Sequence, residues 1–169
     1  TLFPYTTLFR SRPELLVLDE PFSGLDPLVR DEFVRGILEV SALGNWTVVV
    51  SSHDIEEVER LADRVAVLDG GKLKVNETTE DLLARYRRVD VTGAPEGAEP
   101  GAGWIEWERA GALTRFVETN YAGEATEAGW RLRFGGAKVE TRVMTLREIF
   151  LCFARAGRGE PAAKKGAAV

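Results

Sequence analysis

Residues 15–27 read Leu-Leu-Val-Leu-Asp-Glu-Pro-Phe-Ser-Gly-Leu-Asp-Pro, and their order predicts a strand, a turn and the start of a helix. The first four residues form a continuous apolar run, which is typical of a strand buried in a parallel sheet. Asp19 and Glu20 end this run, so two carboxylates lie at the carboxyl end of the strand. Asp26 and Pro27 predict a helix start, with Asp26 as N-cap and Pro27 at the first helical position.

The alternation of strand and helix continues beyond this stretch. The predicted elements are, in order, a helix from Pro27 to about Ala42, a buried strand over 47–50, a helix over 54–62 and a strand over 64–68. Asp54 and Glu57 form a capping-box pattern at the start of the second helix. This order predicts an α/β fold with a parallel sheet and right-handed crossovers.

Polar residues follow the first two strands at the edge where parallel sheets carry their chemistry. Asp19 and Glu20 follow the first strand, and Ser51-Ser52-His53-Asp54 follows the second, so we expect the two groups to be neighbours. A strand-end aspartate can hold Mg²⁺ through its water shell, and Glu20 can polarise an attacking water as a general base. His53 can hydrogen-bond a γ-phosphate oxygen. Each feature alone also fits a polar strand end or a structural histidine; only the combination indicates a phosphoryl-transfer site.

Three segments together resemble ABC-type ATPases. Residues 15–27 resemble the Walker B segment and D-loop, and residues 48–54, Val-Val-Val-Ser-Ser-His-Asp, resemble the H-loop. Residues 64–72, Arg-Val-Ala-Val-Leu-Asp-Gly-Gly-Lys, resemble the strand and turn that follow the H-loop. The resemblance covers residues 12–87 and implies part of a P-loop NTPase fold of the ABC ATPase kind, with a parallel sheet and helices.

The resemblance also implies roles for individual residues. Asp19 looks like the Walker B aspartate that holds Mg²⁺ through water, Glu20 like the catalytic glutamate and His53 like the switch histidine. Ser23 and Asp26 lie in the segment that looks like the D-loop, which in this family sits at a dimer interface and couples two ATP sites. ATP and Mg²⁺ are the cofactors implied.

Other motifs of the family are not found in these residues. No G-x-x-x-x-G-K-[ST] sequence occurs, and neither the Q-loop nor an LSGGQ-type signature is present. Residues 1–11, Thr-Leu-Phe-Pro-Tyr-Thr-Thr-Leu-Phe-Arg-Ser, resemble the translation of a sequencing-adapter oligonucleotide and lack the features of a signal peptide. We therefore expect residues 1–11 to be an artefact, and the rest to be a C-terminal fragment that is inactive alone.

The remaining sequence predicts a second, smaller unit. Asp69-Gly70-Gly71 predicts a hairpin turn into residues 72–75, and Thr78 or Thr79 predicts a helix cap. Strands are predicted over 89–92, 104–107 and 113–117, with a flexible loop over 93–103. The segment over 124–134 is ambiguous between strand and helix, and a capping box at Thr145 and Glu148 predicts the start of a final helix. The expected divisions are an artefact over 1–11, the C-terminal half of a nucleotide-binding domain over 12–88, a small α+β accessory module over 89–156 and a disordered tail over 157–169.

Composition excludes several classes of protein. No run of 18 apolar residues exists, so a membrane-spanning helix is not expected. A single cysteine and a single histidine exclude an intramolecular disulfide and a His/Cys metal cage; Cys152 is expected to be a small buried apolar residue. The net charge of −5 argues against nucleic-acid binding.

The end of the chain indicates which class of ABC ATPase the sequence resembles. A helix over 79–86, a strand-rich module and residues 144–150 resemble the ending of ATP-binding subunits of ABC-2 type exporters. This resemblance implies an ATPase that energises export, partnered by transmembrane permease subunits and a second nucleotide-binding subunit, in the cytoplasm at the inner face of the membrane. The alternative is a soluble ABC-type ATPase acting on DNA or ribosomes. Since the sequence has neither a heptad array nor a basic patch, transport is favoured and no nucleic-acid partner is expected.

Overall fold

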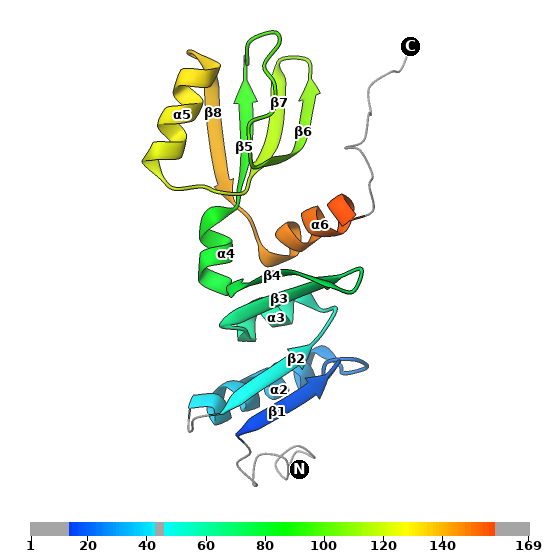
Figure 1. Ribbon diagram of the computed structural model, residues 1–169. Helices are drawn as coiled ribbons and strands as arrows, with labels where there is room; N and C mark the ends of the chain where they lie inside the picture. Colours follow the sequence, from blue (N-terminus) through cyan, green and yellow to red (C-terminus); the bar gives the residue numbers. More distant parts are fainter. Residues whose placement is uncertain (1–13, 43–45, 158–169) are drawn as a thin grey trace. The chain divides into compact units, whose positions relative to one another are not determined.

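The computed structural model describes residues 14–42 and 46–157 (Figure 1). The chain divides into two compact units, Thr1–Ala62 and Asp63–Val169. The predicted artefact over 1–11 and residues 158–169 of the predicted disordered tail lie outside the described residues. Gly157, the first residue of that predicted tail, is instead the last residue of a helix. Across the two described ranges, no helix has both the length and the apolar character needed to cross a membrane.

The first unit contains a parallel pair of strands joined by a helix. Its elements are β1 (Leu15–Asp19), α2 (Pro27–Ala42), β2 (Thr47–Ser51) and α3 (Ile55–Leu61). β1 and β2 pair in parallel, from Leu15 opposite Thr47 to Asp19 opposite Ser51. The strand–helix–strand order and the parallel pairing confirm the predicted α/β class.

One face of this two-stranded sheet packs on α2 and the other is exposed. Among the described residues of the unit, Phe22, Phe33, Val34 and Ile37 form a buried core cluster, and Leu18, Val48 and Val50 pack against it. On the opposite face Leu15, Val17 and Val49 are 55%, 65% and 48% exposed. The prediction of fully buried strands was therefore wrong, because α2 covers only one face and side chains of a strand alternate between faces.

The aspartates at the starts of α2 and α3 make different contacts. As predicted, Asp26 caps α2: its Oδ1 accepts from the backbone N–H of Leu28 at 3.0 Å and of Val29 at 3.1 Å. Asp54 occupies the N-cap of α3 but makes no side-chain capping bond. Its carboxylate accepts instead from the guanidinium of Arg30. The predicted capping box was wrong, because the Asp54 carboxylate is bound to Arg30, a cation on α2 that lies 24 residues away in the sequence.

The second unit begins with an antiparallel hairpin of β3 (Arg64–Asp69) and β4 (Lys72–Thr78). Gly70 and Gly71 form its two-residue turn with φ of 55° and 72°, values that glycine adopts without strain. β3 had been expected as a third parallel strand. That expectation was wrong, since β3 and β4 form a sheet separate from that of β1 and β2. Thr78 caps α4 (Thr79–Arg85) by accepting from the Asp81 N–H at 3.1 Å.

A four-stranded antiparallel sheet follows, in the order β6-β7-β5-β8. Its strands and the two helices of this region are β5 (Arg87–Thr92), β6 (Trp104–Ala110), β7 (Leu113–Glu118), β8 (Lys138–Val143), α5 (Glu124–Phe134) and α6 (Leu146–Gly157). α5 runs beside the sheet (Figure 1), and its Trp130 and Phe134 join Val89, Val91 and Phe116 in one core cluster. Because Trp130 and Phe134 are four residues apart, one helix face buries both, and the ambiguous segment is a helix.

The loop over residues 93–103, which was expected to be flexible, contains no helix or strand, and side chains bond to its backbone. Arg109 donates to the carbonyl oxygens of Pro95 at 2.9 Å and Ala94 at 3.0 Å, and Arg133 donates to that of Glu99 at 2.7 Å. β8 was not expected from the sequence.

The boundary between the two compact units falls after Ala62. The domain boundary at residue 88 was predicted from motifs and not from compactness, so it stays a prediction.

The α2 cap gives a first test. Asp26→Ala leaves the Leu28 and Val29 N–H groups without their acceptor, so we expect the free energy of unfolding to fall by about 1 kcal/mol. Asp26→Asn keeps an acceptor and is expected to lose only a few tenths of this, measured by urea unfolding of the same chain. Equal losses in both variants would contradict the capping role.

The second test concerns Glu148 at the start of α6. The Arg142 guanidinium, at 2.6 Å, is the main cause that lowers the pKa of Glu148 from its ordinary value of 4.5 to about 2. Because the folded pKa is depressed, the ionised Glu148 stabilises the fold fully above pH 4.5, and this stabilisation is lost as the pH falls through about 2.

Glu148→Gln keeps a side chain able to complete the capping box with Thr145 but removes the charge. We expect a loss of about 0.5–1 kcal/mol at pH 7, and this loss should shrink as the pH falls through about 2. The control is Glu140→Gln, which removes an exposed partner of Lys138. The assignment fails if thermal melts across this pH range do not distinguish the two variants.

Candidate functional site

The predicted site residues come together at the carboxyl ends of β1 and β2. Asp19 lies opposite Ser51 in the parallel pair. The Glu20 N–H donates to the Ser51 carbonyl oxygen at 2.9 Å and to Ser51 Oγ at 3.2 Å. Ser51 Oγ donates in turn to Asp19 Oδ1. Ser51 thus connects the ends of both strands, a role that the sequence analysis did not assign to it.

His53 approaches the carboxylate of Glu20 from the loop after β2. Its backbone N–H donates to Glu20 Oε1 at 3.1 Å, and its Nδ1 lies 2.7 Å from Glu20 Oε2. The His53 side chain is 81% exposed and that of Glu20 39% exposed, so the pair opens to solvent. The expectation that the two strand ends are neighbours is confirmed; the chemical roles of Asp19, Glu20 and His53 stay predictions.

Glu20 has an unusual backbone conformation. Its φ is 45°, in the left-handed region that a residue with a side chain rarely adopts. The Ser23 N–H donates to the Glu20 carbonyl oxygen at 3.1 Å, which closes a tight turn after β1. Such strain costs on the order of 1 kcal/mol and tends to occur where a side chain must be aimed. Here the turn directs the carboxylate towards His53.

Ser23 and Asp26 lie further along the same segment, and both are exposed. Within residues 14–42 and 46–157, neither side chain hydrogen-bonds to Asp19, Glu20 or His53. The Asp26 carboxylate is engaged in capping α2. Asp26 therefore has a structural role as the cap of α2. The role of Ser23 and Asp26 at a dimer interface stays a prediction.

The donor set at Asp19 fits a hydrated Mg²⁺ rather than a metal held by protein ligands alone. No group of three or more His, Cys, Asp or Glu side chains suited to a metal occurs in the described part of the chain. Mg²⁺ typically takes one or two carboxylates and completes its shell with water and substrate phosphates. Asp19 is exposed, and only its Oδ1 is engaged, by Ser51.

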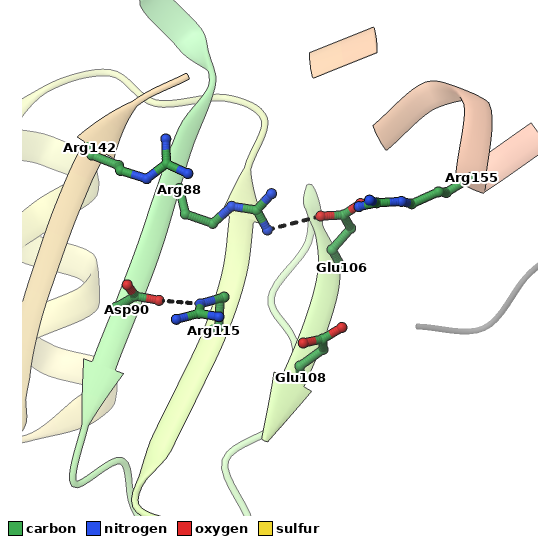
Figure 2. Close-up of a pocket in the computed structure, with 7 residues that line it drawn as sticks. All are labelled: Arg88, Asp90, Glu106, Glu108, Arg115, Arg142 and Arg155. Carbon is green, nitrogen blue, oxygen red and sulfur yellow. Dashed lines mark hydrogen bonds and ion pairs between the residues drawn. The ribbon is translucent and has the colours of Figure 1, made fainter. Parts of the chain in front are cut away.

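A second polar cluster lines a cavity of about 400 Å³ in the second unit (Figure 2). It contains Arg88, Asp90, Glu106, Glu108, Arg115, Arg142 and Arg155. Its arginines pair with acids: Arg88 and Arg155 lie 2.9 and 2.6 Å from the Glu106 carboxylate, and Arg115 lies 2.6 Å from that of Asp90.

The pairs with arginine change the pKa of Glu106. Burial by itself raises its pKa, but the hydrogen bonds from Arg155 and Arg88 together hold the pKa of Glu106 below its ordinary value. Arg142 pairs with Glu148 of α6. Each arginine that lines the cavity thus has an acidic partner within the unit, and the cluster connects α6 to the sheet. The ends of β1 and β2 remain the better candidate for chemistry.

Comparison with known proteins identifies relatives of this chain. A family model described as "AAA domain, putative AbiEii toxin, Type IV TA system" matches residues 1–59. An uncharacterized ABC transporter ATP-binding protein of Nostoc sp. is 42% identical over 81 residues, which cover 48% of this chain and 24% of that protein. The energy-coupling factor transporter ATP-binding protein EcfA of Methanothermobacter thermautotrophicus is 50% identical over 72 residues, covering 43% of this chain and 23% of EcfA.

A solved structure is also similar. CbiO1 from Clostridium perfringens, part of the ABC transporter complex CbiONQ, is 30% identical, with a TM-score of 0.39, and the match covers 43% of this chain and 29% of CbiO1. The chain thus spans about a quarter of the length of the curated relatives that it matches. These relatives confirm the resemblance predicted from the motifs: by sequence, this chain is related to the ATP-binding proteins of ABC transporters.

Proposed function

We propose that this chain supplies the water-activating part of an ATP-hydrolysing site in the ATP-binding subunit of an ABC transporter. The observation that carries the proposal is the placement of the Glu20 carboxylate, bonded by His53 through both its oxygens, beside Asp19 at the ends of β1 and β2. A carboxylate for a metal, a second carboxylate for water and an imidazole for a phosphate are the groups that phosphoryl transfer to water requires.

Asp19 would hold Mg²⁺ through water, and the bound ion would neutralise charge on the phosphates of ATP. The Ser51 hydroxyl donates to Asp19 Oδ1, which leaves Oδ2 available to bind water of the metal shell. The same hydroxyl accepts from the Glu20 N–H, so one side chain sets the position of both carboxylates.

Glu20 would accept the proton of the attacking water, and His53 would assist this step. The 2.7 Å contact joins Glu20 Oε2 and His53 Nδ1, and it can be made with the proton on either atom. A proton on Nδ1 can donate to the ionised Glu20, and a proton on Nε2 can donate to a phosphate oxygen. An imidazole that carries both would contact Glu20 and the phosphate together, while Glu20 Oε1 takes the proton of the attacking water.

Ser23 and Asp26 would lie at the interface with a second nucleotide-binding subunit. Both side chains are exposed, while the backbone around them is held by the turn at Glu20 and the start of α2. A rigid, exposed segment next to the strand ends is suited to contact a partner close to bound ATP.

The proposed role of the whole protein is to energise export through transmembrane permease subunits, in the cytoplasm at the inner face of the membrane. A transport role is supported by the Nostoc protein and EcfA, both ATP-binding proteins of transporters by name. Export is proposed because α4, the strand-rich module and the residues opening α6 resemble the ending of ABC-2 type exporter subunits. The 169-residue chain lacks a P-loop sequence, and we propose that it is inactive alone.

The decisive experiment replaces Glu20 by Gln in the protein made from its complete gene. Gln is nearly isosteric but cannot accept the water's proton, so we expect kcat for ATP hydrolysis to fall by about 10²–10⁴-fold. ATP binding should persist, and the trapped nucleotide should hold two subunits together in size-exclusion chromatography. The assignment of Glu20 is overturned if the variant keeps more than about a tenth of wild-type turnover.

Two further variants separate the other roles. His53→Ala should also lose turnover, because the phosphate contact is removed while the base remains. Asp19→Asn should raise the Mg²⁺ concentration needed for half-maximal activity. A control outside the site is Glu39→Gln, an exposed change on α2 that is expected to leave turnover unchanged.

The 169-residue chain itself provides a separate test. Because it contains no P-loop sequence to cradle the β- and γ-phosphates, we expect titration calorimetry with Mg-ATP to detect no tight binding and a phosphate-release assay to detect no hydrolysis. Binding in the micromolar range would contradict the proposed inactivity of the isolated chain.

A further inference from the structure

An ion pair connects the residue after His53 to the helix that follows the D-loop-like segment. Asp54 directly follows His53, and its carboxylate accepts from Nη1 of Arg30. Arg30 lies in the first turn of α2, where its N–H donates to the Asp26 carbonyl oxygen at 3.0 Å. The pair therefore joins the His53 loop to the start of α2, 24 residues earlier in the chain.

This ion pair is partly enclosed within the first unit. The Arg30 and Asp54 side chains are only 29% and 27% exposed. Within the described residues, Arg30 Nε is buried without a hydrogen-bond partner, so the guanidinium is partly desolvated and depends on Asp54 for compensation. Removing one partner of an enclosed charge pair leaves the other charge without compensation, so the two side chains depend on each other.

The Asp54 side chain bonds to Arg30 instead of capping α3. It stands at the N-cap of α3, yet its side chain makes no cap hydrogen bond, and its own N–H donates to Ser52 Oγ at 3.0 Å. The backbone on both sides of His53 is thus anchored: Glu20 Oε1 accepts its N–H, and the Asp54 carboxylate is bound to α2.

We propose that Arg30 is a positioning residue that acts through Asp54 to hold His53 in contact with Glu20. This inference rests on the proposed function for its catalytic consequence. Arg30 touches none of the groups assigned to the reaction. Its effect would be on the alignment of the imidazole, and small misplacements of an aligned group cost about 10²-fold in rate.

The chain offers a matched control on the same two helices. Arg60 of α3 pairs with Asp31 of α2 at 2.8 Å, and Arg60 lowers the pKa of Asp31 through this hydrogen bond. This second pair also connects α2 with α3, but it is more exposed and lies at the far end of α3 from His53. If each pair only linked the two helices, breaking either pair would change kcat to the same extent.

The test compares Arg30→Gln and Asp54→Asn with Asp31→Asn in the complete protein. We expect Arg30→Gln and Asp54→Asn to lower kcat by about 10- to 100-fold with KM for ATP changed little, because alignment rather than nucleotide binding is disturbed. Asp31→Asn should stay within about twofold of wild type, as expected for an exposed pair. The exchanged double variant Arg30→Asp with Asp54→Arg should recover a large part of kcat.

Hydrogen exchange keeps the inference testable whatever the outcome of the activity assays. Amides of residues 51–54 should exchange faster in Arg30→Gln than in Asp31→Asn, with the rest of the first unit unchanged. Equal kinetics and equal exchange in the two variants would overturn the positioning role while leaving the proposed function intact. A wild-type protein without ATPase activity would overturn the proposed function, and exchange would then decide the structural part of the inference alone.

Discussion

The parallel pairing of β1 with β2 is the constraint on which the site depends. Register places Asp19 opposite Ser51, and the ladder extends by one more bond, from the Glu20 N–H to the Ser51 carbonyl oxygen. A slip of one residue would turn every side chain of the strand to the other face. Asp19 would then leave the Ser51 hydroxyl, and Glu20 would no longer face His53. The pairing is thus the structural basis of the proposed chemistry.

The strained turn after β1 is stabilised by packing. Glu20 has φ of 45°, which costs on the order of 1 kcal/mol. Two residues later Phe22 is buried, and its ring meets that of Phe33 edge to face at 5.9 Å. Burying a phenylalanine side chain stabilises by about 1.5–3 kcal/mol. The apolar contact with α2 is therefore large enough to offset the strain that aims the carboxylate.

In the second unit, a backbone irregularity in β6 brings two tryptophans to the same face of the sheet. Glu106 adopts φ of 52° where the pairing of β6 with β7 shifts register. Because of this bulge, Trp104 and Trp107 lie on the same face despite their odd spacing, stacked at 5.6 Å beside Phe116. Glu106 meets Arg88 and Arg155. One face is thus an aromatic core, and the other carries paired charges.

Several features could be predicted from sequence because their partners are close along the chain. The cap at Asp26, the Gly70–Gly71 turn and the capping box of Thr145 and Glu148 all formed as expected. Each involves backbone groups within three residues, so local sequence determines it. The neighbourhood of Asp19, Glu20 and His53 was also predictable, since parallel strands end at one edge of a sheet.

Other features were decided only by the tertiary structure. β8 has mostly exposed side chains and little apolar pattern, and it forms because the β5 edge offers backbone partners. Asp54 looked like a local cap, but Arg30, 24 residues away, takes its carboxylate. Ser51 acquired its role from the strand ends that it joins. Local sequence is enough to identify the residues that can do the chemistry and the residues that form the turns. Which of their atoms meet depends on long-range pairing, because a charge or a backbone edge bonds to the partner that the fold brings nearest.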